Sequence, residues 1–222
     1  MNSEDRFMGN LYQRFPINIS RGKGAKVWDD EGREYIDCMA GYGVALVGHC
    51  NDRVVQAIKS QVEKLIVCHM SAYNDTRLEF LEKLAKISPA GLSKVAFSNS
   101  GAESVEAALK FARKYTGKAG IIAMAGGYHG KTLGALSVTY NEKYRKPFMP
   151  LLDLVKFVPY NDLARLDEEI NDSIGTVILE PIQGETGIII PPDGLLQRIR
   201  EVCTSRKIVL IYDEIQSGLG RT

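Results

Sequence analysis

The 222-residue sequence has no long apolar run and no block of one charge, and each absence excludes a class of function. No stretch approaches the roughly 20 apolar residues that a membrane helix needs. Charge is almost balanced, with 28 Lys and Arg against 27 Asp and Glu. A basic patch for nucleic acid or for an anionic membrane is therefore not expected, and we predict small-molecule ligands, with no nucleic-acid or membrane partner.

Signals for export and for metal binding are also missing. The N-terminal stretch MNSEDRFMGNLYQRFP carries acidic residues where a secretion signal needs positive charge. The four cysteines include no C-x-x-C pair, so neither a disulfide framework nor a zinc site is predicted. The three histidines form no i, i+4 pair, which favours local hydrogen bonding over metal ligation. We expect a cytoplasmic protein without a metal.

What the sequence does contain is an alternation of strand and helix patterns. AKVWDDEGREYIDC alternates on both sides of Asp30-Glu31-Gly32, which predicts a β-hairpin. Five later runs are β-prone, namely KVAFS, GIIAM, VKFV, TVILE and IVLIY. The clearest helical patterns are RVVQAIKSQVEKL, ESVEAALKFARKY and GLLQRIREVCTSR. The alternation predicts an α/β fold whose mainly parallel sheet is covered by helices on both faces.

Polar or glycine-rich clusters follow three of the predicted strands. They are Ser98-Asn99-Ser100-Gly101 after KVAFS, Gly126 to Lys131 after GIIAM, and Asp213 after IVLIY. Ligands of open α/β sheets bind beyond the carboxyl ends of the strands, so these clusters are the candidate site.

The first cluster also starts a helix. Ser100 and Glu103 have the spacing of a capping box, in which each side chain bonds the backbone amide of the other residue. The amides of Gly101 and Ala102 would stay free at the positive end of the helix dipole, a place suited to phosphate. Taken alone, the turn favours an ordinary capped helix without a ligand.

A nucleotide-binding alternative has to be weighed. IVLIYDE is similar to a Walker B strand, and GGYHGKT ends in the Gly-Lys-Thr of a P-loop. The P-loop pattern would need glycine at position 125, where this chain has Ala125, and LGALSVTY is only a weak helix signal. A P-loop NTPase remains the second hypothesis.

Considered together, the clusters suit one particular cofactor. A helix N-terminus for a phosphate, the ring of Tyr128 and the carboxylate of Asp213 would hold a phosphorylated, flat, protonatable ring. Pyridoxal phosphate has these properties. A carboxylate beside its ring nitrogen keeps that nitrogen protonated, and the charged ring then accepts electrons during transamination.

From about Gly22 to Thr222 the sequence resembles the class III pyridoxal-phosphate-dependent aminotransferases, which act on ornithine, acetylornithine, 4-aminobutyrate and diamines. The resemblance lies in GYGVALVGHC, FSNSGAESVEAALKFAR, GGYHGKTLGALS, VILEPIQGETG and YDEIQSGLGRT. It implies a fold type I, pyridoxal-phosphate-dependent transferase-like architecture. It also implies an N-terminal segment with hairpin and helix over 1–70, and most of the large cofactor-binding domain over 71–222.

The resemblance also implies residue roles. The cofactor-binding set is Ser100, Gly101, Ala102, Tyr128, His129, Asp213 and Gln216. Asp213, the catalytic residue, would pair with the pyridine nitrogen, and Gln216 would reach the phenolic oxygen of the ring. The amides of Gly101 and Ala102 would bind phosphate, and Tyr128 would stack on the ring.

Substrate contacts are implied for four residues. Lys131 stands where many members have an arginine that binds a substrate carboxylate, and lysine lacks the bidentate geometry of arginine. Glu185 matches a glutamate that pairs with an arginine of the C-terminal region. Tyr42 and Tyr73 match substrate-facing aromatics, although ordinary half-buried tyrosines explain them equally well.

The resemblance implies transfer of an amino group from an ω-amino or acetylornithine-like donor to a 2-oxo acid, 2-oxoglutarate. The acetylornithine and lysine-biosynthetic branch is favoured by TYNEKYRKPFMPLL, ahead of the 4-aminobutyrate and diamine branches. In the family the Schiff-base lysine lies C-terminal to the DEIQ segment, which ends here at Gln216. We therefore expect a domain that is incomplete at its C-terminal end, inactive alone, and part of a homodimer when full-length.

Overall fold

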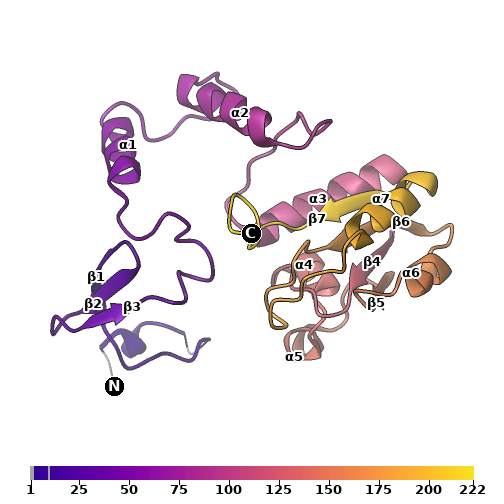
Figure 1. Ribbon diagram of the computed structural model, residues 1–222, viewed down its shortest axis with the longest axis horizontal. Helices are drawn as coiled ribbons and strands as arrows, with labels where there is room; N and C mark the ends of the chain where they lie inside the picture. The colour runs from indigo at the N-terminus through magenta and orange to yellow at the C-terminus, as the bar shows by residue number, and fades with distance from the viewer. Residues whose placement is uncertain (1–2, 10) are drawn as a thin grey trace. The chain divides into compact units, whose positions relative to one another are not determined.

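The computed structural model describes residues 3–9 and 11–222, which form two units, Met1–Ala72 and Tyr73–Thr222 (Figure 1). Among the described residues, none of the helices is both long enough and apolar enough to span a bilayer.

The first unit holds a small antiparallel sheet and one α-helix. A 3-10 helix η1 (Ser3–Arg6) precedes β1 (Ile19–Lys23), β2 (Lys26–Asp29) and β3 (Glu34–Ile36), which pair in the order β1-β2-β3. The pairing of β2 with β3 confirms the predicted hairpin. Helix α1 (Asp52–Val62) follows and is capped by Asn51, whose side chain accepts bonds from the Arg53 and Val54 amides.

One buried carboxylate organises the hairpin turn. Asp29 is 2% exposed, and its Oδ1 accepts bonds from the amides of Glu31 at 3.1 Å and Arg33 at 2.8 Å. Its Oδ2 accepts from Arg33 Nε at 2.7 Å and from the Tyr35 hydroxyl at 2.8 Å. Burial by itself raises the pKa of Asp29, but the hydrogen bonds from Arg33 and Tyr35 outweigh it and lower the pKa to about 2.

The second unit is built on a four-stranded parallel sheet in the order β5-β4-β6-β7. The strands are β4 (Gly120–Met124), β5 (Val155–Val158), β6 (Ile174–Leu179) and β7 (Val209–Tyr212). The helices are α2 (Asp75–Ile87), α3 (Gly101–Thr116), α4 (Leu133–Val138), α5 (Glu142–Arg145), η2 (Lys146–Phe148), α6 (Leu163–Glu169) and α7 (Leu195–Ser205). The predicted α/β class with a mainly parallel sheet is confirmed.

Helices cover both faces of this sheet, because side chains of the central strands alternate between two cores. Ile121 and Ala123 of β4 pack with residues of α3 and α4 on one face. Ile122 and Met124 pack with residues of α6 and α7 on the other. Every residue of β4 and β6 is buried, which fits the nearly unbroken apolar runs that predicted them.

The strand order places a topological switch point between β4 and β6. The chain leaves β4 toward β5 on one side, and then returns to β6 on the other side of β4. Connections therefore diverge at the carboxyl ends of β4 and β6, and a crevice suited to ligands is expected there. The loop that contains Gly126 to His129 follows β4, and Glu180 follows β6.

Two local predictions were wrong or incomplete. KVAFS forms no strand, because no neighbouring strand pairs with it in the described chain. Its Val95 and Phe97 stay substantially exposed, and Phe97 meets Phe80 of the unpredicted helix α2 at 5.9 Å between ring centroids. LGALSVTY, a weak helix signal, does form a helix, but α4 is only six residues long.

Asp29 predicts a loss of hairpin stability in acid. Because the folded pKa is about 2 and the ordinary value is 3.8, the stabilisation from Asp29 is present above pH 3.8 and is lost as pH falls toward 2. Trp28, the only tryptophan, adjoins Asp29, so its fluorescence should change over this range. In Asp29→Asn the change should be absent, and an unaltered acid transition in that variant would contradict the assignment.

Candidate functional site

A buried pair of titratable side chains joins the ends of β4 and β7. His129 Nδ1 lies 2.7 Å from Asp213 Oδ2, and both side chains are nearly inaccessible to solvent. Asp213 Oδ1 accepts a bond from the Ile215 amide at 3.1 Å. His129 Nε2 is buried without a hydrogen-bond partner among the described residues. The pair thus holds a carboxylate in a fixed orientation at the carboxyl edge of the sheet.

The N-terminus of α3 provides free backbone donors. The Ser100 hydroxyl accepts from the Glu103 amide at 3.2 Å, as predicted. Glu103 Oε2 accepts from the Asn99 amide at 2.6 Å, so the expected bond to the Ser100 amide is wrong by one residue. The amides of Gly101 and Ala102 have no acceptor among the described residues, which leaves two donors for an anion at the positive end of a 16-residue helix.

Glycines bring these loops into direct contact. A Cβ on Gly101 would lie 2.9 Å from Ile215 Cδ1, so the loop after β7 packs closely on the start of α3. Gly130 has φ +128°, and a Cβ there would lie 2.8 Å from the Ala102 Cβ. The His129–Asp213 bond completes the arrangement, in which the α3 N-terminus, the β4 loop and the β7 loop all meet.

Glu180 fixes the backbone of Tyr128 across the switch point. Its Oε2 accepts from the Tyr128 amide at 3.0 Å and its Oε1 from the Gly184 amide at 3.4 Å. Burial raises the pKa of Glu180, while the Tyr128 amide and the charge of His129 lower it in part. Glu180 thus orients the loops after β4 and β6 relative to one another.

Thr139 and Glu106 hold the same loop, and sequence reasoning missed both. The Thr139 hydroxyl is buried, accepts from the His129 amide at 2.9 Å, and lies 3.1 Å from the Gly130 carbonyl oxygen. Glu106 Oε1 accepts from the Gly134 amide at 2.8 Å, at the start of α4. No motif identifies either residue, because each is brought to the loop by the packing of α3 and α4.

The bonding of the β4 loop argues against a P-loop. The amides of Gly127, Tyr128 and His129 donate to the Met124 carbonyl at 3.0 Å, to Glu180 and to Thr139, respectively. A phosphate cradle needs these amides free, and a carboxylate at the centre of the loop would repel phosphate. The nucleotide-binding alternative is not supported.

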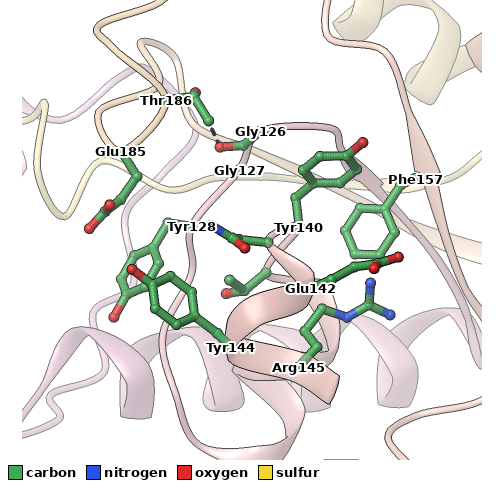
Figure 2. Close-up of a pocket in the computed structure, with 12 residues that line it drawn as sticks. Gly126, Gly127, Tyr128, Tyr140, Glu142, Tyr144, Arg145, Phe157, Glu185 and Thr186 are labelled. Atoms are coloured by element: carbon green, nitrogen blue, oxygen red, sulfur yellow. Dashed lines mark hydrogen bonds between the residues drawn. The ribbon is translucent and has the colours of Figure 1, made fainter. Parts of the chain in front are cut away.

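A cavity of about 480 Å³ opens beside Tyr128 (Figure 2). Tyr128 and Tyr144 meet edge to face with ring centroids 6.0 Å apart, and Lys131 Nζ lies 5.2 Å from the Tyr144 ring centroid. Glu185 also lines the cavity. Two of the four predicted substrate residues, Lys131 and Glu185, are therefore near Tyr128.

The other predicted residues are placed differently. Gln216 lies over Gly184, since a Cβ on Gly184 would overlap its amide. Tyr73 is fully exposed at the start of the second unit. Tyr42 is an exposed residue of the first unit. Their role at the site stays a prediction.

The site has the donor set that a phosphorylated, protonatable ring requires. The free amides at the start of α3 suit a phosphate, and buried Asp213 suits a cationic ring nitrogen. An aromatic side chain, Tyr128, lies on the loop next to this pair. The arrangement therefore fits pyridoxal phosphate.

Comparisons with known proteins agree with this geometry. The family model for class-III aminotransferases matches residues 7–222, so the chain belongs to the class III aminotransferase family. The family depends on pyridoxal phosphate, which confirms the expected class of enzyme and its cofactor.

Individual relatives share the sequence and the fold. The chain is 50% identical to the acetylornithine aminotransferase of Methanopyrus kandleri over 98% of its own length and 56% of that protein. It is 42% identical to ornithine aminotransferase 1 of Staphylococcus aureus, covering 98% of this chain and 57% of that protein. The ornithine aminotransferase of Toxoplasma gondii, solved with pyridoxal phosphate at partial occupancy, superposes with a TM-score of 0.91 at 35% identity, over 97% of this chain and 52% of that one.

The chain spans about half the length of the curated relatives that it matches. The structural match confirms the predicted transferase fold, of which these residues form the N-terminal part.

The Thr139 bond predicts a stability difference between two buried threonines. Thr139→Val leaves the buried His129 amide without an acceptor and should lower the free energy of unfolding by about 1–3 kcal/mol. Thr176→Val is the matched control, because the buried Thr176 hydroxyl on β6 has no hydrogen-bond partner in the described chain. Urea denaturation should show the control unchanged or stabilised, and equal losses in both variants would contradict the role of Thr139.

Proposed function

We propose that the whole protein is an aminotransferase that passes an amino group from an acetylornithine-like or ω-amino donor to 2-oxoglutarate, using pyridoxal phosphate. The observation that carries this proposal is the buried His129–Asp213 pair beside the free amides of Gly101 and Ala102. The acetylornithine and lysine-biosynthetic branch is preferred to the 4-aminobutyrate or diamine branch. Relatives named acetylornithine aminotransferase, at 44–50% identity, support this preference.

Asp213 would hold the proton on the pyridine nitrogen. Its Oδ2 is oriented by His129 and its Oδ1 by the Ile215 amide, so the carboxylate cannot rotate freely. When bound, pyridoxal phosphate supplies an electron sink for the carbanion that transamination forms. A buried carboxylate next to the ring nitrogen favours the protonated ring, because the opposite charge is poorly screened there.

Other residues would bind and orient the cofactor. Gly101 and Ala102 would donate to the phosphate while Ser100 keeps the turn in shape. Tyr128 would cover the ring, held by the bond from its amide to Glu180. Gln216, beside Gly184, would reach the phenolic oxygen.

The substrate would be bound beside Tyr128. Lys131 and Glu185 lie close to that residue and are the proposed contacts to substrate charges. Tyr42 and Tyr73 are proposed as substrate-facing aromatics that reach the site in the assembled enzyme.

The rest of the enzyme would complete the chemistry. The Schiff-base lysine is proposed to lie in the half of the protein beyond these residues, so that the 222 residues alone are inactive. We also propose a homodimer and a cytoplasmic location for the full-length protein, with residues 1–70 as its N-terminal segment and 71–222 as part of its large domain.

The role of Asp213 is tested in the full-length protein. Asp213→Asn should lower the rate of the half-reaction with amino donor by a factor on the order of 10² or more, because asparagine cannot hold the ring nitrogen protonated. Asp193→Asn, at an exposed position before α7, makes the same substitution away from the site and should keep the wild-type rate. Stopped-flow absorbance of the cofactor measures both, and a wild-type rate in Asp213→Asn would exclude the proposed function.

A further inference from the structure

Arg145 is a cation without an anionic partner. This half-buried residue ends α5, and its guanidinium makes no ion pair with any described residue. Its Nε is buried and has no hydrogen-bond acceptor in the described part of the chain. A buried N–H without an acceptor is costly, and more so when the group is charged. An anionic ligand bound to the guanidinium would offset part of that cost by pairing its charge.

The side chain of Arg145 is held in position by an aromatic surface. The guanidinium carbon lies 4.6 Å from the centroid of the Phe157 ring, within the range of a cation–π contact. Tyr140 packs edge to face on the same ring at 5.4 Å. Stacking fixes the plane of the guanidinium and leaves its edge for a planar acceptor such as a carboxylate.

The cavity beside Tyr128 includes this arginine. Figure 2 shows Arg145, Phe157 and Tyr140 among the side chains that line it. Its volume of about 480 Å³ is sufficient for a small-molecule ligand. Tyr128, proposed above to cover the cofactor ring, forms another part of the lining, so the cavity adjoins the place where the amino group would be transferred.

Two carboxylates of the lining restrict the ligand further. Glu142 and Glu185 both line the cavity, and neither forms an ion pair with a described residue. Figure 2 shows Glu142 on the same side of the cavity as Arg145, and Glu185 on the opposite side. A ligand with two negative ends would meet repulsion from Glu185 at the end away from Arg145, whereas one carboxylate together with a cationic amine matches the charges of Arg145 and Glu185.

We infer that Arg145 binds the carboxylate of the amino donor. This inference rests on the proposed function and adds a specificity residue to it. The donor is then held at one end by the fork of Arg145 while its amine extends toward Tyr128.

The test measures binding rather than turnover, by saturation-transfer NMR on the full-length protein loaded with the aminated cofactor, pyridoxamine phosphate, which has no aldehyde to react with the amine of a donor. The probes are 5-aminopentanoate, glutarate and 1,5-diaminopentane, which share a five-carbon chain and differ in charge at the two ends. Arg145→Gln should raise the dissociation constant of 5-aminopentanoate about tenfold, as expected for the loss of a charge-assisted pair. It should leave that of 1,5-diaminopentane unchanged.

Lys143→Gln is the matched control, because Lys143 is exposed on the same short helix and loses the same charge. It should leave all three dissociation constants within twofold of wild type, and Arg145→Lys should give an intermediate value for 5-aminopentanoate. If Arg145→Gln unfolds, the dissociation constants of all three probes should rise equally. The wild-type protein then tests the inference, because it should bind 5-aminopentanoate more tightly than 1,5-diaminopentane.

Three results would overturn the inference. They are equal affinity of the wild type for 5-aminopentanoate and 1,5-diaminopentane, no effect of Arg145→Gln on 5-aminopentanoate, and an effect on glutarate alone. The last result would assign Arg145 to the 2-oxo acid acceptor instead of the donor. If Asp213→Asn keeps full activity while Arg145→Gln weakens 5-aminopentanoate, the proposed function fails and the carboxylate site stands.

Discussion

The hydrogen bond between His129 and Asp213 is the contact on which the site depends. It joins residues 84 positions apart and links the loops that follow β4 and β7, which are not adjacent in the sheet. A buried titratable pair is a weak source of stability, because the cost of removing both groups from water offsets much of their attraction. An apolar pair of equal volume would hold the loops as well. The pair is better explained by a ligand that needs a desolvated, oriented carboxylate.

The loop after β4 and the turn before α3 both contain glycine, and they differ in how many of their backbone amides are still free to bind a ligand. In the loop after β4, protein acceptors, including the carboxylate of Glu180, occupy the amides. At the start of α3, the side chains of Ser100 and Glu103 accept bonds from the amides of Glu103 and Asn99, respectively. The amides of Gly101 and Ala102 stay free. Free amides at a helix N-terminus attract an anion, whereas a carboxylate inside a turn repels one. We therefore propose that the phosphate of the cofactor binds at the start of α3 and that the β4 loop positions Tyr128 and His129.

Much of the fold could be predicted from sequence because the relevant patterns are local. The apolar runs of β4 and β6, the periodicity of α3 and the turn at Asp30-Glu31-Gly32 depend on neighbouring residues alone. KVAFS failed for the opposite reason, since a strand exists only when another strand pairs with it. Thr139 and Arg145 were missed because their partners, His129 and Phe157, are set by the packing of short helices that no motif encodes. The resemblance identified Asp213 as a site residue, but its bond to His129 required the structure.

The central claim is that Asp213 keeps the ring nitrogen of the cofactor protonated. The most direct test is the ¹⁵N chemical shift of pyridoxal phosphate labelled at the ring nitrogen and bound to the full-length protein. We predict the shift of a protonated pyridinium at neutral pH, with a proton coupling on that nitrogen. An unprotonated nitrogen in the wild-type protein would contradict the account, because the buried pair would then lack the function assigned to it.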